Sequence, residues 1–178
     1  MPIRIYGNRE IKTLAGEATR PTSARVREAL FNIWQGRILD CRWLDLCAGS
    51  GAMGAEALCR GAAEVVGIEK SGAACRIVEH NWQKVAKPEQ QYRIVKGDVV
   101  NQVKGLSDKF DRVYFDPPYA GELYQPVIAK LTAILTPQGE AAVEYDATMW
   151  QPTRIPEELE IVREKRYGST HLVFLRLA

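Results

Sequence analysis

Short apolar runs alternate with stretches of helical periodicity through most of the chain, and this alternation indicates the fold. The expected strands cover 43–47, 64–69, 92–96, 113–115 and 140–145. The expected helices are one that opens at 49–54 and runs to about residue 60, then 73–85, a short one after residue 98, and 123–135, which Pro137-Gln138-Gly139 should stop. Strands that alternate with helices at these intervals predict a doubly wound α/β sheet with right-handed crossovers.

The last two segments, 160–167 and 171–177, flank Gly168-Ser169-Thr170 and predict an antiparallel hairpin that closes the sheet. With the five strands before them they give a mostly parallel sheet of seven strands with helices on both faces. Residues 3–14 alternate around a turn at 7–9 and predict a further, small N-terminal hairpin.

A short helix is expected at 24–34, after the N-terminal hairpin. Thr22 or Ser23 is the expected cap. Its apolar stripe consists of Val26, Leu30 and Ile33. The arginines of this region, expected on the polar side, are Arg20, Arg25 and Arg27.

Composition fits a single globular domain with a short extension. The chain has 178 residues, of which 46% are hydrophobic and 26% charged, and this balance argues against disorder. We expect an extension at 1–20 and the main domain at 21–178. No apolar run approaches the length of a membrane span, and the first residues lack a signal peptide's apolar stretch.

The cysteines and histidines indicate neither a metal site nor a nucleophile. Four cysteines, at 41, 47, 59 and 75, show no metal-type pairing, and reduced thiols are typical of a cytoplasmic protein. His80 and His171 stand alone in the sequence, so each is expected to be a surface or packing residue. We therefore expect a cytoplasmic protein that uses no metal and contacts no membrane.

Positive charge is concentrated at the N-terminus. Residues 1–27 carry six Arg and Lys against Glu10 and Glu17, a balance of +4, while the other 18 bases and 20 acids give −2. In the predicted hairpin, Arg4 and Lys12 fall on polar positions. A basic region of this kind suits a polyanion such as a nucleic acid, although a solvated basic surface explains the charge alone equally well.

The loop Asp116-Pro117-Pro118-Tyr119 directly follows the apolar run at 113–115. Both prolines lack an N–H group and have a fixed φ, so the chain must leave the sheet as a stiff, extended loop. This loop holds a carboxylate, backbone carbonyls and an aromatic ring at the carboxyl end of a strand, where open α/β sheets bind ligands. The alternative is that Asp-Pro-Pro-Tyr is only a turn.

Two rigid acceptors suit a planar NH2 group, because the Asp116 carboxylate can accept one N–H and a backbone carbonyl the other. Such a grip orients a poorly nucleophilic, conjugated amine and stabilises the positive charge that develops on it. Tyr119 can stack on a flat substrate, which contributes about 1–3 kcal/mol per base.

A second candidate site is the glycine-rich segment between the strand at 43–47 and its helix. Gly49, Gly51 and Gly54 form a G-x-G-x-x-G pattern, which is weak evidence by itself and would usually suggest a dinucleotide. Glu69 ends the next strand and can accept hydrogen bonds from both hydroxyls of a ribose. This suits NAD and S-adenosylmethionine equally well. Asp45 lies four residues before Gly49, where a carboxylate would repel a pyrophosphate but attract an ammonium.

Two further features favour S-adenosylmethionine over a dinucleotide. Asp98 ends the third strand, where it could accept from an adenine amine, although an Asx turn after Gly97 is the alternative. The chain also has no second mononucleotide-binding half.

The order of these features resembles amino-methyltransferases that act on exocyclic or amide nitrogens. The segment from Thr19 to Asn32, together with Leu44 to Gly61, resembles the bacterial 16S ribosomal RNA guanine-N2 methyltransferase family, and the likeness covers nearly the whole chain. The resemblance implies a Rossmann-like methyltransferase with a small RNA-binding hairpin. One departure is Cys47, where the family more often has a larger apolar residue.

The resemblance also implies roles for particular residues. The substrate-amine site comprises Asp116, Pro117, Pro118 and Tyr119. The S-adenosylmethionine site comprises Asp45, Ala48, Gly49, Ser50, Gly51, Glu69, Lys70, Asp98 and Val99. The RNA-binding residues are Arg4, Lys12, Arg20 and Arg25.

The expected activity is direct methyl transfer to the N2 amine of one guanine in 16S ribosomal RNA. The base must be looped out or single-stranded to reach such a pocket. We expect a monomer that acts on ribosomal RNA within a small-subunit particle. The alternatives are an adenine-N6 methyltransferase, a glutamine methyltransferase acting on a protein, and a non-catalytic RNA-binding module.

Overall fold

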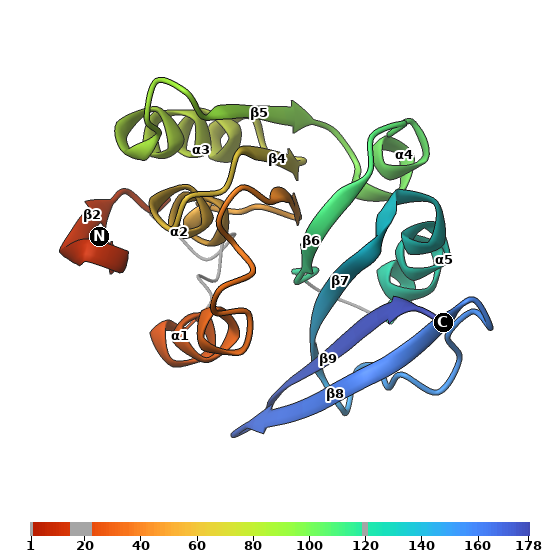
Figure 1. Ribbon diagram of the computed structural model, residues 1–178. Helices are drawn as coiled ribbons and strands as arrows, with labels where there is room; N and C mark the ends of the chain where they lie inside the picture. The colour runs from red at the N-terminus through yellow and green to blue at the C-terminus, as the bar shows by residue number, and fades with distance from the viewer. Residues whose placement is uncertain (1, 15–22, 119–120) are drawn as a thin grey trace.

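A seven-stranded sheet forms the centre of the computed structural model, which describes residues 2–14, 23–118 and 121–178 (Figure 1). In spatial order its strands are β5 (Gln91–Lys96), β4 (Glu64–Glu69), β3 (Arg42–Leu46), β6 (Phe110–Phe115), β7 (Leu135–Asp146), β9 (Thr170–Leu177) and β8 (Leu159–Tyr167). The first five are parallel, whereas β9 and β8 form the antiparallel closing hairpin. The predicted α/β sheet is confirmed.

Helices cover both faces of the sheet. They are α1 (Ala24–Ile33), α2 (Ala52–Cys59), α3 (Gly72–Val85), α4 (Val99–Lys104) and α5 (Tyr124–Ile134), with a 3-10 turn η2 at Gly121–Leu123. Alternate strand residues point to opposite faces. Trp43 and Tyr114 belong to the core shared with α1, α2 and α3, whereas Leu44 and Phe115 belong to the core shared with α4 and α5. In Figure 1 the first three helices and the last two likewise lie on opposite sides.

The strand order brings the ends of β3 and β6 together as neighbours. From β3 the chain crosses through α2 to β4 on one side, and from β6 it crosses through α5 to β7 on the other. Adjacent strands whose connections leave in opposite directions open a crevice at their carboxyl ends. The glycine-rich segment and the Asp-Pro-Pro loop both begin at this crevice.

The N-terminal hairpin is shorter than expected and is docked on the helices. Its strands are β1 (Ile3–Ile5) and β2 (Arg9–Ile11), joined by the 3-10 turn η1 (Tyr6–Asn8). Ile5 and Ile11 are buried in the core shared with α1 and α2. The Asn81 side chain on α3 accepts from the Lys12 N–H at 2.9 Å and donates to the Lys12 carbonyl at 2.8 Å.

Helix α1 confirms the predicted cap but corrects the position of one arginine. The Ser23 hydroxyl accepts a hydrogen bond from the Val26 N–H at 3.2 Å. Arg27, expected on the polar side, is only 4% exposed. Its guanidinium pairs with Glu56 at 3.1 Å and donates to the Arg4 carbonyl at 2.7 Å. The polar side of α1, which was expected to face solvent, therefore packs in part against the N-terminal hairpin and α2.

The segment Pro137-Gln138-Gly139 lies inside strand β7 instead of stopping a helix. Helix α5 has already ended at Ile134, and the pairing with β6 passes from Phe110–Leu135 to Arg112–Glu140, which leaves a bulge between them. A Cβ atom on Gly139 would lie 2.8 Å from the Phe110 carbonyl oxygen, so the bulge requires glycine there. The proline and the glycine correctly indicated an interruption of regular structure at this point. The pairing of β7 with β6 determines that the interruption is a bulge in a strand.

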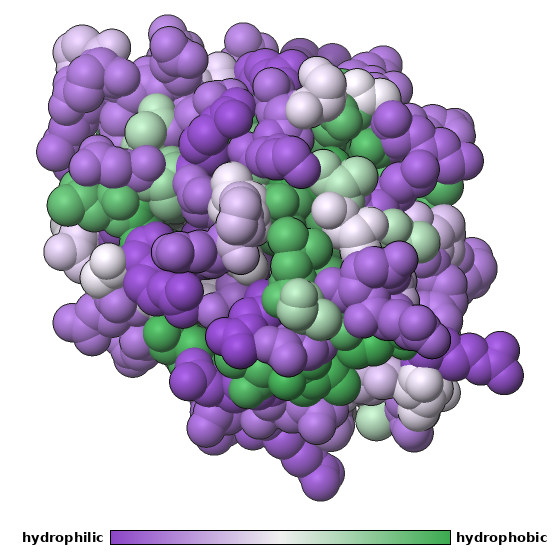
Figure 2. Space-filling view, turned by 45° about the vertical axis from the view of Figure 1, so that its right-hand side comes forward, coloured by the Kyte–Doolittle hydropathy of each residue, from purple (hydrophilic) through white to green (hydrophobic). Residues whose placement is uncertain are grey.

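The surface seen in Figure 2 is mostly polar, with apolar residues gathered in bands between the polar ones. Within the described part of the chain, no helix is long and apolar enough to cross a membrane.

Candidate active site

A cavity of about 740 Å³ lies at the carboxyl ends of the parallel strands. It collects most of the residues that the sequence analysis assigned to the cofactor and to the substrate amine. Those among its lining residues are Asp45, Ala48, Gly49, Ser50, Glu69, Lys70, Asp98, Val99, Asp116, Pro117 and Pro118. Gly51 lies beside them as the N-cap of α2. Tyr119 and Arg20 fall outside the residues that the structure describes.

The glycine-rich loop passes close to a tryptophan beneath it. Gly51 has a φ of 76°, and a Cβ atom there would lie 2.8 Å from the Trp82 ring nitrogen. Gly54 is tighter still, because its Cβ atom would lie 2.5 Å from the same ring. Gly49 differs: its φ is 60°, but a Cβ atom there would meet nothing within 4 Å, and the residue lines the cavity. Two of the glycines therefore accommodate Trp82, and Gly49 leaves space for a ligand.

Hydrogen bonds hold this loop from two directions. The Glu69 carboxylate at the end of β4 accepts from the Gly49 N–H at 2.7 Å and from the Ser71 N–H at 3.0 Å. The buried Asn81 side chain donates to the Ser50 carbonyl at 2.9 Å. Each carboxylate oxygen can accept more than one hydrogen bond, so Glu69 can hold the loop and still bind a hydroxyl pair.

Asp45 carries the strongest indication of a cationic ligand. Its carboxyl is 1% exposed, and its Oδ2 atom has no hydrogen-bond partner among the described residues. Burial raises the pKa of Asp45 well above its usual range, a backbone hydrogen bond from Gly54 opposes this, and the charge on Glu69 adds to it. A buried carboxylate oxygen without a partner is costly unless a cation completes it.

Asp98 combines the two roles that its sequence position allowed. Its carboxylate caps α4 by accepting from the Asn101 N–H at 3.1 Å, as a local turn would require. It also lines the cavity beside Val99. The capping contact therefore fixes the Asp98 carboxylate at the cavity wall. Lys70, by contrast, is exposed at the end of β4.

The cavity as a whole is acidic. Lys70 is the one basic residue among its described lining residues. The acidic residues are Asp45, Glu69, Asp98, Asp116, Glu122, Glu144 and Asp146. The described part of the chain contains no group of three or more His, Cys, Asp or Glu arranged to hold a metal ion. The field of these carboxylates repels a pyrophosphate and attracts the ammonium and sulfonium of S-adenosylmethionine, so the lining fits that cofactor.

Cys47 lies among these carboxylates and has a positive φ of 62°. Burial raises the pKa of its thiol, and the charges of Glu69, Asp116, Asp45 and Asp98 raise it further. The thiol is therefore protonated at neutral pH and is not a nucleophile. The charges that act on this thiol therefore come from the cofactor side and from Asp116 alike.

The Asp-Pro-Pro loop leaves the sheet as expected. Strand β6 ends at Phe115, and Asp116, Pro117 and Pro118 follow without regular structure and line the cavity. Pro117 is buried, whereas Pro118 is exposed. The loop is therefore part of the cavity wall that faces the glycine-rich segment.

Sequence reasoning missed several residues of the substrate side. The Tyr114 hydroxyl donates to the Glu144 carboxylate, and the Tyr124 hydroxyl donates to the Glu144 carbonyl at 2.9 Å. All three residues line the cavity, as do Ser23 and Thr170. The signal that could have indicated Glu144 is an ionisable residue that directly follows the apolar run Ala141-Ala142-Val143, near the carboxyl end of β7.

The predicted RNA-binding residues lie in different parts of the molecule. Arg4 and Lys12 are exposed on the N-terminal hairpin, and the Arg4 guanidinium lies 3.8 Å from the Glu10 carboxylate. Arg25 lies on α1, with its guanidinium 5.8 Å from the ring centre of Tyr167. Ser23, the cap of the same helix, lines the cavity, and Arg25 follows it by two residues. Among the described residues, Arg4 and Lys12 have no such neighbour in the sequence.

Comparison with known proteins identifies the family. Residues 3–176 match the family described as Conserved hypothetical protein 95. Ribosomal RNA small subunit methyltransferase D of Escherichia coli is 31% identical over 173 residues, which cover 94% of this chain and 86% of that protein. The protein of the same name from Haemophilus influenzae is 28% identical over 166 residues, which cover 92% of this chain and 86% of that protein.

A solved structure gives the same result. Escherichia coli yhhF, provisionally described as a methyltransferase, superposes with a TM-score of 0.87 at 28% identity, over 99% of this chain and 98% of that one. The predicted fold, family and cofactor are therefore confirmed. The chain belongs to the Conserved hypothetical protein 95 family of S-adenosylmethionine-dependent, Rossmann-like methyltransferases.

Proposed function

We propose that the protein transfers a methyl group from S-adenosylmethionine to the N2 amine of a guanine in small-subunit (16S) ribosomal RNA. One observation carries the proposal: the Asp116-Pro117-Pro118 loop and the acidic, glycine-rich cofactor side line the same cavity. The names of the relatives from Escherichia coli and Haemophilus influenzae support ribosomal RNA as the substrate.

On the cofactor side, each residue has a distinct task in this proposal. Asp45 binds the ammonium of the methionine part, Glu69 accepts from the ribose hydroxyls, and Asp98 accepts from the adenine amine. Ala48, Gly49, Ser50 and Gly51 provide the loop that the cofactor lies against, while Lys70 and Val99 flank the ribose and adenine. The Gly49–Glu69 hydrogen bond of 2.7 Å keeps the loop and the ribose site in register.

On the substrate side, Asp116 accepts one N–H of the amine, and a carbonyl beside Pro117 or Pro118 accepts the other. When bound, the cofactor supplies an electrophilic methyl group on its sulfonium. Asp116 does not deprotonate the amine first, because a carboxylate is far too weak a base for an aryl amine. Its hydrogen bond strengthens as the nitrogen becomes cationic, and the carboxylate can then hold the proton that the nitrogen loses. Tyr119 is proposed to stack on the base.

The RNA backbone must stay outside the acidic cavity while one neutral base enters it. Looping the base out of its stack satisfies this requirement. We propose that the hairpin at 1–20 extends the domain at 21–178 and that Arg4, Lys12, Arg20 and Arg25 contact phosphates. We also propose that the protein acts as a cytoplasmic monomer on a small-subunit particle and needs no metal.

Methyl-labelled S-adenosylmethionine incubated with small subunits or 16S ribosomal RNA that lack the modification tests the function. The expected product on nucleoside analysis is N2-methylguanosine at one position, formed at least about 10²-fold more slowly by the Asp116→Ala enzyme. N6-methyladenosine would instead indicate the adenine-N6 activity, and label on a protein glutamine would indicate the third candidate. Cofactor binding without transfer to any substrate would indicate a binding module.

A further inference from the structure

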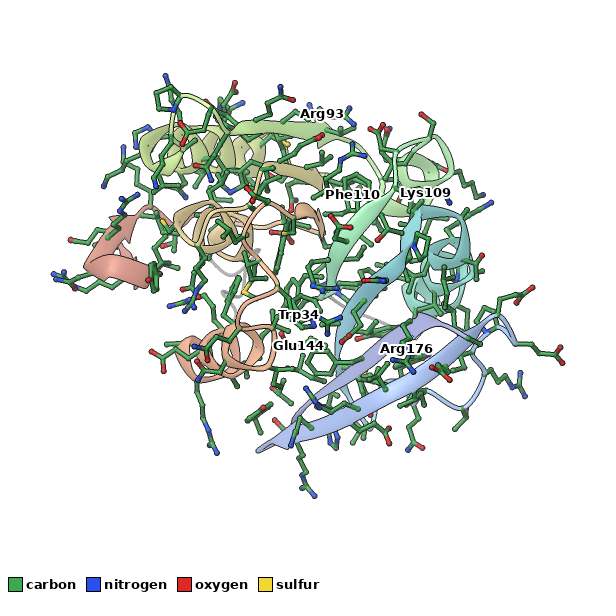
Figure 3. The ribbon with its side chains drawn as sticks, in the orientation of Figure 1. Trp34, Arg93, Lys109, Phe110, Glu144 and Arg176 are labelled. Carbon is green, nitrogen blue, oxygen red and sulfur yellow. The ribbon has the colours of Figure 1, made fainter. Side chains whose placement is uncertain are left out.

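Glu144 lies on β7, the strand next to β6, which ends just before Asp116. Strands β6 and β7 pair in parallel, with Tyr114 opposite Ala142 and Phe115 opposite Val143. Asp116 directly follows the last paired residue of β6, and Glu144 directly follows the last residue of β7 that pairs with it. Because side chains alternate between faces, Glu144, two residues after Ala142, projects to the face that carries Tyr114, whose hydroxyl it accepts from. Asp116 and Glu144 both line the cavity, and Figure 3 shows Glu144 on β7.

Two tyrosines hold Glu144 in place. The Tyr114 hydroxyl donates to its side-chain carboxylate, and the Tyr124 hydroxyl donates to its backbone carbonyl at 2.9 Å. Tyr114 is 2% exposed and Tyr124 is 5% exposed, so packing restrains both rings. Burial, followed by the charges of Asp116, Glu144 and Asp146, raises the pKa of the Tyr124 phenol, which places these carboxylates around one ring. The Glu144 carboxylate is thus an oriented acceptor.

The edge of guanine offers a second donor next to the amine. Its exocyclic N2 amine and its ring N1–H are adjacent, and both donate hydrogen bonds. In adenine and in 2-aminopurine, N1 carries no hydrogen and presents a lone pair. A carboxylate that accepts from the N1–H of guanine therefore repels the bare N1 of these other bases.

We propose that Glu144 accepts the N1–H of the target guanine while Asp116 grips its amine, with Tyr114 as the positioning residue. This inference rests on the proposed function, because it concerns how the same cavity selects its base. A site built to hydrogen-bond a substrate N–H discriminates strongly against an analogue that lacks it, because the acceptor then loses that hydrogen bond and faces a lone pair instead. Glu144 thus selects guanine, whereas Asp116 selects the amine.

The test compares guanosine with 2-aminopurine ribonucleoside at the target position, in small-subunit RNA assembled from ligated fragments. Both bases carry the 2-amino group that is methylated, so a difference in rate between them reports on the N1–H that only guanine has. The parental enzyme should prefer guanosine in kcat/KM by at least about 10²-fold. Glu144→Gln should reduce this preference at least about tenfold, because an amide can turn its NH2 toward the bare N1. Tyr114→Phe should reduce it less.

Glu89→Gln is the matched control, because Glu89 is exposed in the turn before β5, at the opposite ends of the strands. It should keep the parental preference. The affinities of the enzyme for the two RNAs, measured with S-adenosylhomocysteine bound, provide the same comparison without turnover. If Glu144→Gln does not fold, Glu144→Ala replaces it. If the parental enzyme methylates guanine and the Glu144 variants keep its preference, this inference alone is wrong. If the parental enzyme makes no N2-methylguanosine, the proposed function is wrong and the role of Glu144 with it.

Discussion

The Glu69 carboxylate accepts a hydrogen bond from the Gly49 N–H at 2.7 Å and so joins the end of β4 to the loop after β3. Removing it should both eliminate an acceptor for the ribose and loosen the loop. We expect Glu69→Ala to weaken S-adenosylmethionine binding by about 1.5–3 kcal/mol, the scale of a charged hydrogen bond. Calorimetric titration measures this loss. Glu64→Ala, at the other end of the same strand, is the control, and equal affinities for both variants would remove Glu69 from the site.

The buried Asp45 carboxyl predicts a pH dependence of cofactor binding. Its raised pKa means that part of the free protein carries a proton on Asp45 below that pKa. An adjacent ammonium favours the ionised form and lowers the pKa again, so binding should release a proton and the affinity should rise as the pH increases through the pKa of the free protein.

Calorimetry in two buffers of different ionisation enthalpy, at a mildly acidic pH, counts the protons released. The Asp45→Asn variant should bind more weakly and lose this part of the proton release. Proton release that is the same in both proteins would assign the ionisation to another group.

Asp116→Ala should leave the fold and cofactor binding nearly unchanged and reduce methyl transfer at least about 10²-fold, the scale of losing one preorganised polar group at a developing charge. Asp116→Asn keeps the shape and one acceptor without the negative charge, so its rate should lie between those of the parental and alanine enzymes. Single-turnover rates on the ribosomal substrate measure the chemical step. A parental rate for Asp116→Ala would make the loop a turn and nothing more.

Tyr119 is predicted to stack on the base, although it lies outside the described residues. Tyr119→Ala should mainly weaken capture of the RNA, whereas Tyr119→Phe keeps the ring and should keep most of the affinity. The dissociation constant of the RNA separates the two variants. A chemical step that slows equally in both would assign the hydroxyl, instead of the ring, to the reaction.

The basic N-terminal region predicts salt-dependent RNA binding. Changing Arg4, Arg20 and Arg25 to alanine should weaken binding and reduce the slope of log K against log salt by about one unit for each phosphate that the variant no longer neutralises. Cofactor affinity should remain unchanged. Lys109→Ala is the control, because Lys109 is exposed just before β6, at the opposite ends of the strands. A parental slope in the triple variant would make this region an ordinary solvated surface.

Arg27 predicts an effect on stability instead of on RNA binding. Its guanidinium pairs with the buried Glu56 at 3.1 Å, and removing one partner of a buried ion pair costs about 3–5 kcal/mol. Arg27→Met should therefore lower the free energy of unfolding strongly, whereas the neighbouring Arg25→Ala should change it little, because Arg25 is exposed. Urea denaturation measures both. Similar stabilities of the two variants would show that the pair contributes little.

The sequence by itself determined the features that depend on residues close together in the chain. The sheet followed from the alternation of apolar runs and helical periods, which forces each segment to bury one face. The Ser23 cap and the stiff Asp116-Pro117-Pro118 loop followed from hydroxyl and proline chemistry within a few residues. The family-like spacing of Asp45, Gly49 and Glu69 predicted a common site, because parallel strands end at the same edge of the sheet.

Only the tertiary structure decided which distant residues meet. Arg27 looks like a solvent-facing residue of an amphipathic helix until the hairpin and Glu56 cover it. The bulge in β7 depends on the Phe110 carbonyl of another strand. Glu144 reads as one of several charged residues in its segment, and it becomes part of the cavity because β7 lies beside β6 and the Tyr114 hydroxyl donates to its carboxylate. Periodicity specifies which face a residue occupies, but the partner across that face comes from the packing of segments far apart in the chain.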